Sequence, residues 1–409
     1  MPPSTPLVGI IGKTNVGKST FFSALTLITV RIENRPFVTI EPNIGVGYVR
    51  KRCAHVELGL PRCNPKNSLC IEGNRFIPVK LMDVAGLIKG AHKGRGLGNK
   101  FMDDLRQADV LLLIVDMAGS TNEEGMPVRP GSYDPAEEIR SIIFEVNEWF
   151  FSILKRDWER FARYLDTLPK DEIVAAITKR VSGLSIRKEH VALALRKSDL
   201  ENKKPSTWSV DDLRNFAYKL REVSKPIVII ANKMDIPEAE DNLKRVREEF
   251  RDLPIMPVSS IYELALRRAS KSGLIKYIPG DRDFKIIDES KLSGKQLRAL
   301  EMIEEFMKKY GGTGVQQALD YAIFQVLGMI VVYPVEDQHK FTDHSGNVLP
   351  DAYLVKRGTT ALELAYMIHT ELGKGFLYAI LAKGDRRVGS NYELRDGDII
   401  KIVSAMARR

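Results

Sequence analysis

The sequence predicts an α/β fold: a mostly parallel sheet, a helical insertion within it, and a small α+β unit at the C-terminal end. Short apolar runs alternate with helix-compatible stretches from residue 7 to about residue 148. Two of these runs, residues 79–83 and 110–116, end in aspartate, which is typical of buried parallel strands whose carboxyl ends meet a ligand. A glycine-rich loop directly follows the apolar run that opens this region, residues 7–11.

The glycine-rich loop, residues 12–19, reads GKTNVGKS and matches G-x-x-x-x-G-K-[ST]. An apolar run precedes it and a helix-compatible run follows, which is the setting of a phosphate-binding loop. Backbone N–H groups at the helix N-terminus attract phosphate, Lys18 reaches the β- and γ-phosphates, and the Ser19 hydroxyl ligates Mg²⁺. We therefore expect nucleotide contacts from Asn15, Val16, Gly17, Lys18, Ser19 and Thr20.

Changes in composition and in apolar pattern divide the chain into units. Residues 149–225 are basic and helical in pattern, with no convincing strand, and an apolar run then resumes. A helical excursion between two strands of one sheet is an insertion, so the sheet-forming domain is predicted to comprise residues 1–148 and 226–328. Residues 329–409 hold mostly strand-like runs with one helical run, which predicts a separate α+β unit.

Two further motifs complete the expected site. The D-x-x-G string DVAG ends a strand-like run; Asp83 would hold Mg²⁺ through a water and the Gly86 N–H would face the γ-phosphate. Thr39, in PFVTIEPN, is a natural switch-region threonine that can ligate Mg²⁺ and sense the γ-phosphate. Lys18, Thr39 and Gly86 are therefore the expected catalytic residues.

The string NKMD, residues 232–235, predicts the base. Its Asp235 carboxylate can accept hydrogen bonds from the N1–H and the exocyclic amine of guanine, whereas adenine lacks this pair of donors and would leave the carboxylate unpaired. Ser259 and Ser260 follow the next strand, where a backbone N–H could read the base O6; a strand-ending turn has the same pattern. The expected base contacts are Asn232, Lys233, Asp235, Ser259 and Ser260.

The strings GKTNVGKSTFF, PFVTIEPN, DVAGLIKGAHKGRGLGNKF and NKMD together resemble the Obg/YchF branch of translation-factor GTPases. PDAYLVKRGTT and YELRDGDIIKIVSA resemble a TGS domain, which implies a β-grasp-like fold for residues 329–409. The resemblance spans nearly the whole chain and implies a Mg²⁺-dependent GTPase that associates with the ribosome as a molecular switch. Many bacterial and eukaryotic YchF relatives depart from N-K-x-D at its last position and favour ATP; Asp235 suggests an archaeal-type, guanine-reading member.

Two features bear on the rate of hydrolysis. Leu87 stands after Gly86, where Ras-like GTPases place a water-orienting glutamine, and the resemblance implies a leucine there. His92 is a conceivable substitute, although a lone histidine beside a switch is more often a surface residue. Asn15 matches the asparagine that ligates K⁺ in potassium-activated GTPases, so K⁺ is a candidate second cation. Intrinsic turnover is expected to be slow.

Charge and composition point to partners and location. The formal net charge is +9, and residues 149–225 carry 17 Lys and Arg against 11 Asp and Glu, whereas residues 329–409 carry 11 against 10. A basic middle segment suits rRNA or the ribosome, although a solvated helical face has the same composition. No apolar run reaches about 18 residues and the first strand begins within a few residues of Met1, so a cytoplasmic monomer without a membrane span is expected.

Cys53, Cys63 and Cys70 lie in one short region beside His55. An odd number of cysteines argues against a disulfide framework. The pattern C-x-H-x₇-C-x₆-C could supply four zinc ligands, but it lacks the usual C-x₂-C knuckle and so favours free thiols. A redox-sensitive pair is a third interpretation.

Two alternatives to the GTPase switch stay open. In one the chain hydrolyses ATP, as its bacterial and eukaryotic relatives do. In the other it is an RNA- or ribosome-binding module in which nucleotide only sets the conformation. A measured preference between ATP and GTP distinguishes the first alternative from the GTPase switch. Ribosome binding by a Lys18→Ala variant distinguishes the second, which predicts that this variant binds ribosomes like wild type.

Overall fold

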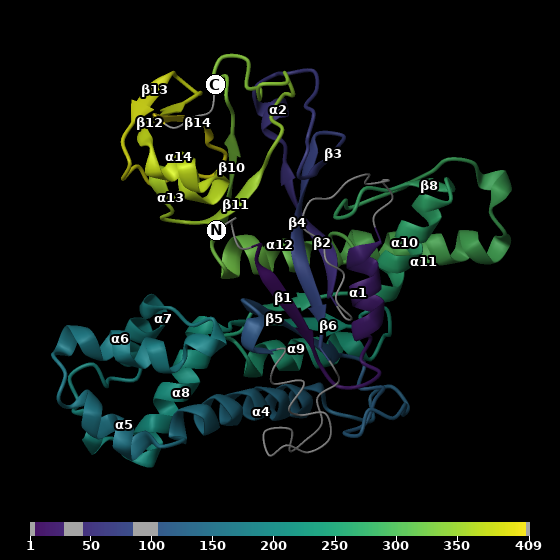
Figure 1. Cartoon of the computed structure of the whole chain (residues 1–409). Coiled ribbons are helices and arrows are strands. Elements are labelled where there is room, and N and C mark those ends of the chain that lie inside the picture. Colours follow the sequence, from purple (N-terminus) through teal and green to yellow (C-terminus); the bar gives the residue numbers. More distant parts are fainter. Residues whose placement is uncertain (1–4, 28–43, 85–104, 406–409) are drawn as a thin grey trace.

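A computed structural model of the chain describes residues 5–27, 44–84 and 105–405. Seven strands form the main sheet in the order β2-β4-β1-β5-β6-β7, with β3 beside β4 (Figure 1). Strands β4, β1, β5, β6 and β7 are mutually parallel, and β2 and β3 run antiparallel to β4. The prediction of a mostly parallel sheet is confirmed. The strands are β1 (Leu7–Ile11), β2 (Ile44–Arg52), β3 (Leu69–Ile71), β4 (Asn74–Asp83), β5 (Val110–Asp116), β6 (Ile227–Asn232) and β7 (Ile255–Pro257).

Strand β5 shows why the sheet carries helices on both faces. All seven of its residues are buried. Leu111, Leu113 and Val115 pack into a core with the long helix α4 (Pro135–Lys155), while the alternating residues Val110, Leu112 and Ile114 pack into a second core with α1 (Lys18–Thr26). A strand buried on both faces has no polar alternation, which explains its continuous apolar sequence.

The helical arm comprises five helices over residues 135–224, joined by 3₁₀ turns at Ser182–Leu184 and Pro205–Thr207. Asp134 caps α4 by accepting a hydrogen bond from the Ala136 N–H, and α4 then continues from the sheet past residue 149, the predicted start of the insertion, without a break. Trp158 and Trp208 stack with ring centroids 5.1 Å apart inside the arm. The other helices are α5 (Trp158–Leu165), α6 (Lys170–Arg180), α7 (Lys188–Lys197) and α8 (Val210–Ser224).

Residues 239–328 complete the sheet domain. A buried ion pair between Glu263 and Arg267 lies where two of its helices meet α1, and the Arg267 guanidinium also faces the Leu25 and Leu27 carbonyls at the end of α1. This network holds the helix that follows the phosphate loop. The elements are α9 (Ala239–Glu249), α10 (Ser260–Lys271), β8 (Ile275–Lys276), β9 (Lys285–Ile286), a 3₁₀ turn (Glu289–Lys291), α11 (Gly294–Tyr310), α12 (Val315–Tyr321) and a π-helical turn (Ala322–Val326).

The C-terminal unit is a separate five-stranded sheet in the order β11-β10-β14-β12-β13, with β10 and β14 parallel and the other pairs antiparallel. Ile330 and Val332 of β10 face the unit's own core, whereas Val331 and Tyr333 pack into the core shared with the main sheet. Strand β10 is thus the docking element between the two sheets (Figure 1). The elements are β10 (Met329–Pro334), β11 (Tyr353–Lys356), α13 (Ala361–Ile368), α14 (Thr370–Lys374), β12 (Phe376–Leu381), β13 (Arg386–Val388) and β14 (Ile399–Ser404). Among the described residues, no helix is both long and apolar enough to cross a membrane.

Candidate nucleotide-binding site

The phosphate loop joins β1 to α1 at the carboxyl edge of the sheet. Gly17 precedes α1 with a φ of 100°, and no described side chain caps the helix. A Cβ at Gly17 would lie 2.3 Å from Asn232 Nδ2, and a Cβ at Gly12 would lie 2.4 Å from the Ile114 carbonyl oxygen. Only glycine therefore lets the backbone pass this close, and the uncapped N–H groups of α1 are left for an anion.

Strand register brings the other motifs to the same edge. Ile10 pairs with Asp83, and Asp116 pairs with Asn232. Asn232 Nδ2 donates a hydrogen bond of 2.8 Å to the Val16 carbonyl, so the N-K-x-D string is tied directly to the phosphate loop. The expected phosphate and base contacts therefore lie together.

Ser259 and Ser260 position the base-reading residues. The Ser259 hydroxyl donates to Asp235 Oδ1 at 2.7 Å, and the Ser260 hydroxyl and N–H both donate to Asn232 Oδ1. The Ser259 N–H donates to the Thr313 carbonyl. Both backbone N–H groups are thus engaged within the protein, and the serine side chains fix the orientation of Asn232 and Asp235.

The groups expected to meet phosphate and Mg²⁺ are close to one another. Lys18 Nζ donates to the Lys13 carbonyl at 2.6 Å. Burial lowers the pKa of Lys18, and the negative charges of Asp83 and Glu138 oppose this shift. Burial raises the pKa of Asp83, opposed by the charge of Lys18 and by a hydrogen bond from the Ser19 side chain. A hydroxyl and a carboxylate in contact are the hard oxygen donors that Mg²⁺ prefers, so Ser19 and Asp83 fit this ion.

Asn15 adopts a left-handed conformation with a φ of 62°. Its Nδ2 donates a 2.9 Å hydrogen bond to the Gly125 carbonyl, in the loop that follows β5. This hydrogen bond uses the amide nitrogen of Asn15. A cation such as K⁺ would bind the other amide atom, the oxygen Oδ1. Thr20 lies in the first turn of α1. Thr39, Gly86, Leu87 and His92 lie outside the described residues.

A buried ion pair that no sequence motif signals lies beside the phosphate loop. Lys13 Nζ lies 3.1 Å from Glu138 Oε2, and both side chains are almost fully buried. Lys13 also donates to the Thr121 carbonyl and lies 4.2 Å from the centre of the Tyr133 ring. Glu138 belongs to the first turn of α4, so the phosphate loop is joined to the helix that carries the arm.

A second charged group stabilises the base-reading motif. Asp116 Oδ2 accepts hydrogen bonds from the Ser120 N–H, from the Ser120 and Thr121 hydroxyls, and from Lys233 Nζ at 2.8 Å. Lys233 is thereby held across the end of β5. Asp116, the aspartate that ends the apolar run of residues 110–116, was the one feature of the sequence that could have indicated this contact.

A phosphate loop tied to an N-K-x-D motif defines a P-loop GTP-binding protein, and comparisons with known proteins agree. Residues 7–154 match the family model described as 50S ribosome-binding GTPase, residues 230–337 match the Obg-like GTPase YGR210-like, G4 motif-containing domain, and residues 345–404 match the TGS domain. GTP-binding protein MJ1332 of Methanocaldococcus jannaschii is 51% identical over 399 residues, covering 98% of this chain and 99% of that protein. The chain belongs to the YchF/Obg-like family of GTP-binding proteins.

Other relatives are more distant. GTP-binding protein C428.15 of Schizosaccharomyces pombe is 35% identical over 372 residues, which cover 88% of this chain and 90% of that protein. A crystal structure of a GTP-binding protein from Pyrococcus horikoshii OT3 superposes with a TM-score of 0.76 at 38% identity, covering 97% of this chain and 99% of that one. The ribosome-binding ATPase YchF of Bacillus subtilis is 25% identical, covering 96% of this chain and 97% of that protein.

The Lys13–Glu138 pair predicts a pH dependence of stability. Burial raises the pKa of Glu138 to about 7, against 4.5 for an ordinary glutamate, and the charge of Lys13 opposes the shift. Between these values the folded protein binds a proton that the unfolded chain has released. The stability that this group contributes is therefore complete below about pH 4.5 and is lost as the pH rises through about 7, by up to about 3 kcal/mol.

The test compares urea unfolding of wild type and Glu138→Gln between pH 5 and pH 8. We expect the wild type to lose stability relative to the variant as the pH rises through this range. Glu137→Gln is the matched control, because Glu137 is the exposed neighbour on the same turn of α4. Parallel stability curves for wild type and Glu138→Gln would contradict the prediction.

Proposed function

We propose that this protein binds GTP, hydrolyses it to GDP and phosphate with Mg²⁺, and uses the bound nucleotide to switch its association with the ribosome. The observation that supports this proposal best is the Asn232 side chain, which joins the guanine-type motif to the phosphate loop. Asp235 is held at the same place by Ser259. A carboxylate fixed beside a phosphate cradle selects a base with two adjacent donors, because any other base leaves it unpaired.

In the proposed reaction, water attacks the γ-phosphorus and the bond to the β–γ bridging oxygen breaks, leaving GDP and phosphate. Such a reaction is accelerated mainly by positioning and by charge stabilisation. Lys18 and the N–H groups at the start of α1 would neutralise phosphate charge, and Ser19 and Asp83 would hold Mg²⁺, which supplies further positive charge when bound. The motifs assign Thr39 and Gly86 to the γ-phosphate. With Leu87 in the place of a water-orienting glutamine, unassisted turnover should lie between about 10⁻⁴ and 10⁻² s⁻¹.

The first prediction from this proposal concerns base selection. GTP and GDP should bind far more tightly than ATP and ADP, and Asp235→Asn should shift the preference toward xanthine nucleotides, since an amide can donate where the carboxylate can only accept. Competition between fluorescent and unlabelled nucleotides measures this. Equal affinity of wild type for ATP and GTP would refute the guanine assignment and favour the ATP-hydrolysing alternative.

The second prediction concerns potassium. Because the Asn15 amide nitrogen is bound to Gly125, its Oδ1 is available for a cation beside the phosphates. K⁺ there would supply charge that an arginine finger otherwise provides. Turnover should be faster in KCl than in NaCl at matched ionic strength, and Asn15→Ala should remove the difference. Identical wild-type rates in the two salts would exclude this role.

The ribosome is the proposed partner because the 50S ribosome-binding GTPase model matches residues 7–154 and because a B. subtilis relative is named a ribosome-binding ATPase. The helical arm offers exposed basic side chains. Lys197 and Lys203 form ion pairs with Glu222 and Asp212 on α8. Several other exposed cations of the arm form no ion pair with a described residue, and Arg187, Lys188, Arg196 and Lys204 are four of them. These four, which lie between the start of α7 and the loop before α8, are candidates for contacts with rRNA phosphates.

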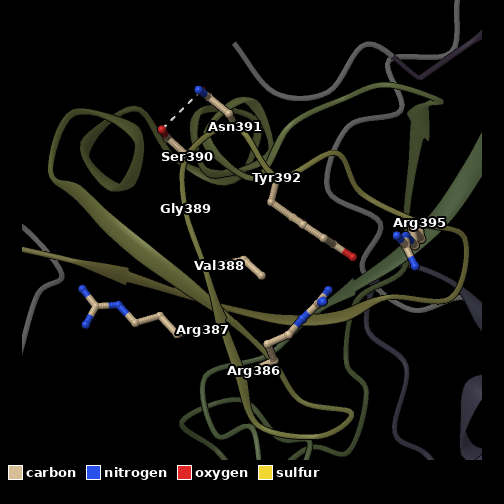
Figure 2. A pocket seen from close by; sticks show the side chains of 8 residues that line it. All are labelled: Arg386, Arg387, Val388, Gly389, Ser390, Asn391, Tyr392 and Arg395. Atoms are coloured by element: carbon tan, nitrogen blue, oxygen red, sulfur yellow. Dashed lines mark hydrogen bonds between the residues drawn. The ribbon is translucent and has the colours of Figure 1, made fainter.

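The TGS domain carries a second basic surface. Arg386, Arg387 and Arg395 line a hollow of about 530 Å³ together with Tyr392 and residues 388–391. Figure 2 shows Arg386 and Tyr392 facing Arg395, with Arg387 pointing the other way. None of the three arginines forms an ion pair with a described carboxylate. The small net charge of residues 329–409 concealed this cluster.

The third prediction separates the two surfaces. An arm variant, Arg187→Glu/Lys188→Glu/Arg196→Glu/Lys204→Glu, should fold and bind GTP normally, lose ribosome binding at low salt and lose ribosome-stimulated hydrolysis. Each phosphate contact removed should also flatten the salt dependence of binding. Co-sedimentation with ribosomes in GDP and in a non-hydrolysable GTP analogue measures this.

The matched comparison is a TGS variant, Arg386→Glu/Arg387→Glu/Arg395→Glu. If the arm is the main electrostatic contact, this variant should weaken binding less than the arm variant. An arm variant that sediments like wild type with the same salt slope would show that the contact lies elsewhere. Lys18→Ala tests the binding-module alternative. That alternative predicts that this variant binds ribosomes like wild type and that the bound nucleotide does not change ribosome binding.

A further inference from the structure

The three cysteines of the chain meet one histidine at the far end of the β2–β4 strand pair. Cys53 directly follows β2, and His55 lies in the short helix α2 (Ala54–Glu57). Cys63 lies in the loop after α2, and Cys70 lies in β3. Folding therefore brings together four residues that are spread over 18 positions of the sequence. They converge although the sequence has no C-x₂-C knuckle.

The distances within this cluster are those of ligands around a single ion. All four ligand atoms lie within 4.8 Å of one another. Cys53 Sγ lies 3.7 Å from Cys63 Sγ, and Cys70 Sγ lies 3.7 Å from His55 Nδ1. A tetrahedral zinc ion with Zn–S bonds of about 2.3 Å holds its sulfur ligands about 3.8 Å apart. In a [4Fe–4S] cluster each ligand binds a different iron atom, and in a [2Fe–2S] cluster the two pairs of ligands bind different iron atoms. Four ligand atoms that all lie within 4.8 Å of one another therefore favour one mononuclear site.

A buried arginine beside the cluster supplies an independent argument. Arg75 is fully buried, and no described carboxylate forms an ion pair with it. Its Nη1 donates to Cys63 Sγ at 3.5 Å and lies 4.0 Å from Cys53 Sγ. A buried cation needs a compensating negative charge. Three thiolates and a neutral histidine around a divalent ion carry a net charge of −1, which is the charge that Arg75 requires.

We propose that Cys53, His55, Cys63 and Cys70 bind one zinc ion. Three soft thiolates and an imidazole in a compact set select zinc over the hard cations Mg²⁺ and Ca²⁺. With three neutral thiols, the nearest negative charge to Arg75 would be the Asp351 carboxylate, which interacts with it electrostatically but forms no ion pair with it. A disulfide between two of the cysteines would not account for the third cysteine and His55 lying in the same cluster. This site is distinct from the nucleotide site and does not depend on the proposed function.

The ion would fasten the sheet domain to the TGS domain. Arg75 Nη2 donates to the Leu349 carbonyl at 2.7 Å. The loop between the ligands also pairs with the same stretch of chain: the Asn64 N–H donates to the Val348 carbonyl, the Lys66 N–H donates to the Pro350 carbonyl, and the Asn67 side chain bonds Ala352. Zinc would fix this loop, and hydrogen bonds from Arg75 to the thiolates would extend the fixation to the TGS domain.

The test is metal analysis of the full-length protein purified without added metal. We expect one equivalent of zinc per chain, retained through gel filtration and absent from Cys63→Ser and Cys70→Ser. Ser68→Ala is the matched control, since Ser68 is a buried polar neighbour in the same loop that offers no metal ligand. Arg75→Met should weaken zinc binding about 10- to 100-fold, as loss of a partner of a metal ligand does.

Cobalt substitution keeps the proposal testable if the cysteine variants do not fold. Wild-type protein stripped of metal and titrated with Co²⁺ should show the intense visible bands of tetrahedral thiolate coordination, which zinc then displaces, and its three thiols should react with an alkylating agent only after zinc is removed. Reduced, folded protein that takes up neither ion, or in which the three thiols react freely, would overturn the proposal. So would a Cys53–Cys63 disulfide in a protein that binds no metal after reduction.

Discussion

The hydrogen bond from Asn232 to the Val16 carbonyl is the constraint on which the nucleotide site depends. It joins the carboxyl end of β6 to the phosphate loop across β5, so it requires the register that pairs Asp116 with Asn232. It also requires glycine at position 17, because any Cβ there would occupy the space of the Asn232 amide. The base-reading motif and the phosphate loop are therefore joined by a direct contact.

A second contact connects this site to the rest of the molecule. Lys13 of the phosphate loop and Glu138 of α4 form a buried pair, and α4 continues unbroken into the helical arm. Removing one partner of a buried pair leaves the other charge uncompensated, at a typical cost of about 3–5 kcal/mol. The phosphate loop is thus in direct contact with the helix that carries the arm.

The features predictable from the sequence are those set by short-range patterns. The phosphate loop, the apolar strands and N-K-x-D each lie within one continuous segment, and all of them are found at the carboxyl edge of a mostly parallel sheet. The Lys13–Glu138 pair was not predictable, because 125 positions separate its partners and Glu138 reads as an ordinary acid in the first turn of a helix. The convergence of the three cysteines and His55 was not predictable for a similar reason: their spacing lacks a C-x₂-C knuckle, and the strand pairing of the folded chain brings the four side chains together.

The net charge of a segment is also an incomplete predictor of its surface. The net charge of residues 149–225 predicted a basic arm, but Lys197 and Lys203 are neutralised by acids on α8. Residues 329–409 are almost neutral in sum, yet three arginines without carboxylate partners among the described residues gather around one hollow. A polyanion responds to the local potential above a surface and hardly to the sum over a domain, since salt screens charges beyond about 10 Å. Exposed cations that lack a partner are therefore a better guide than net charge to where a polyanion would be attracted, and both the arm and the TGS domain present such cations.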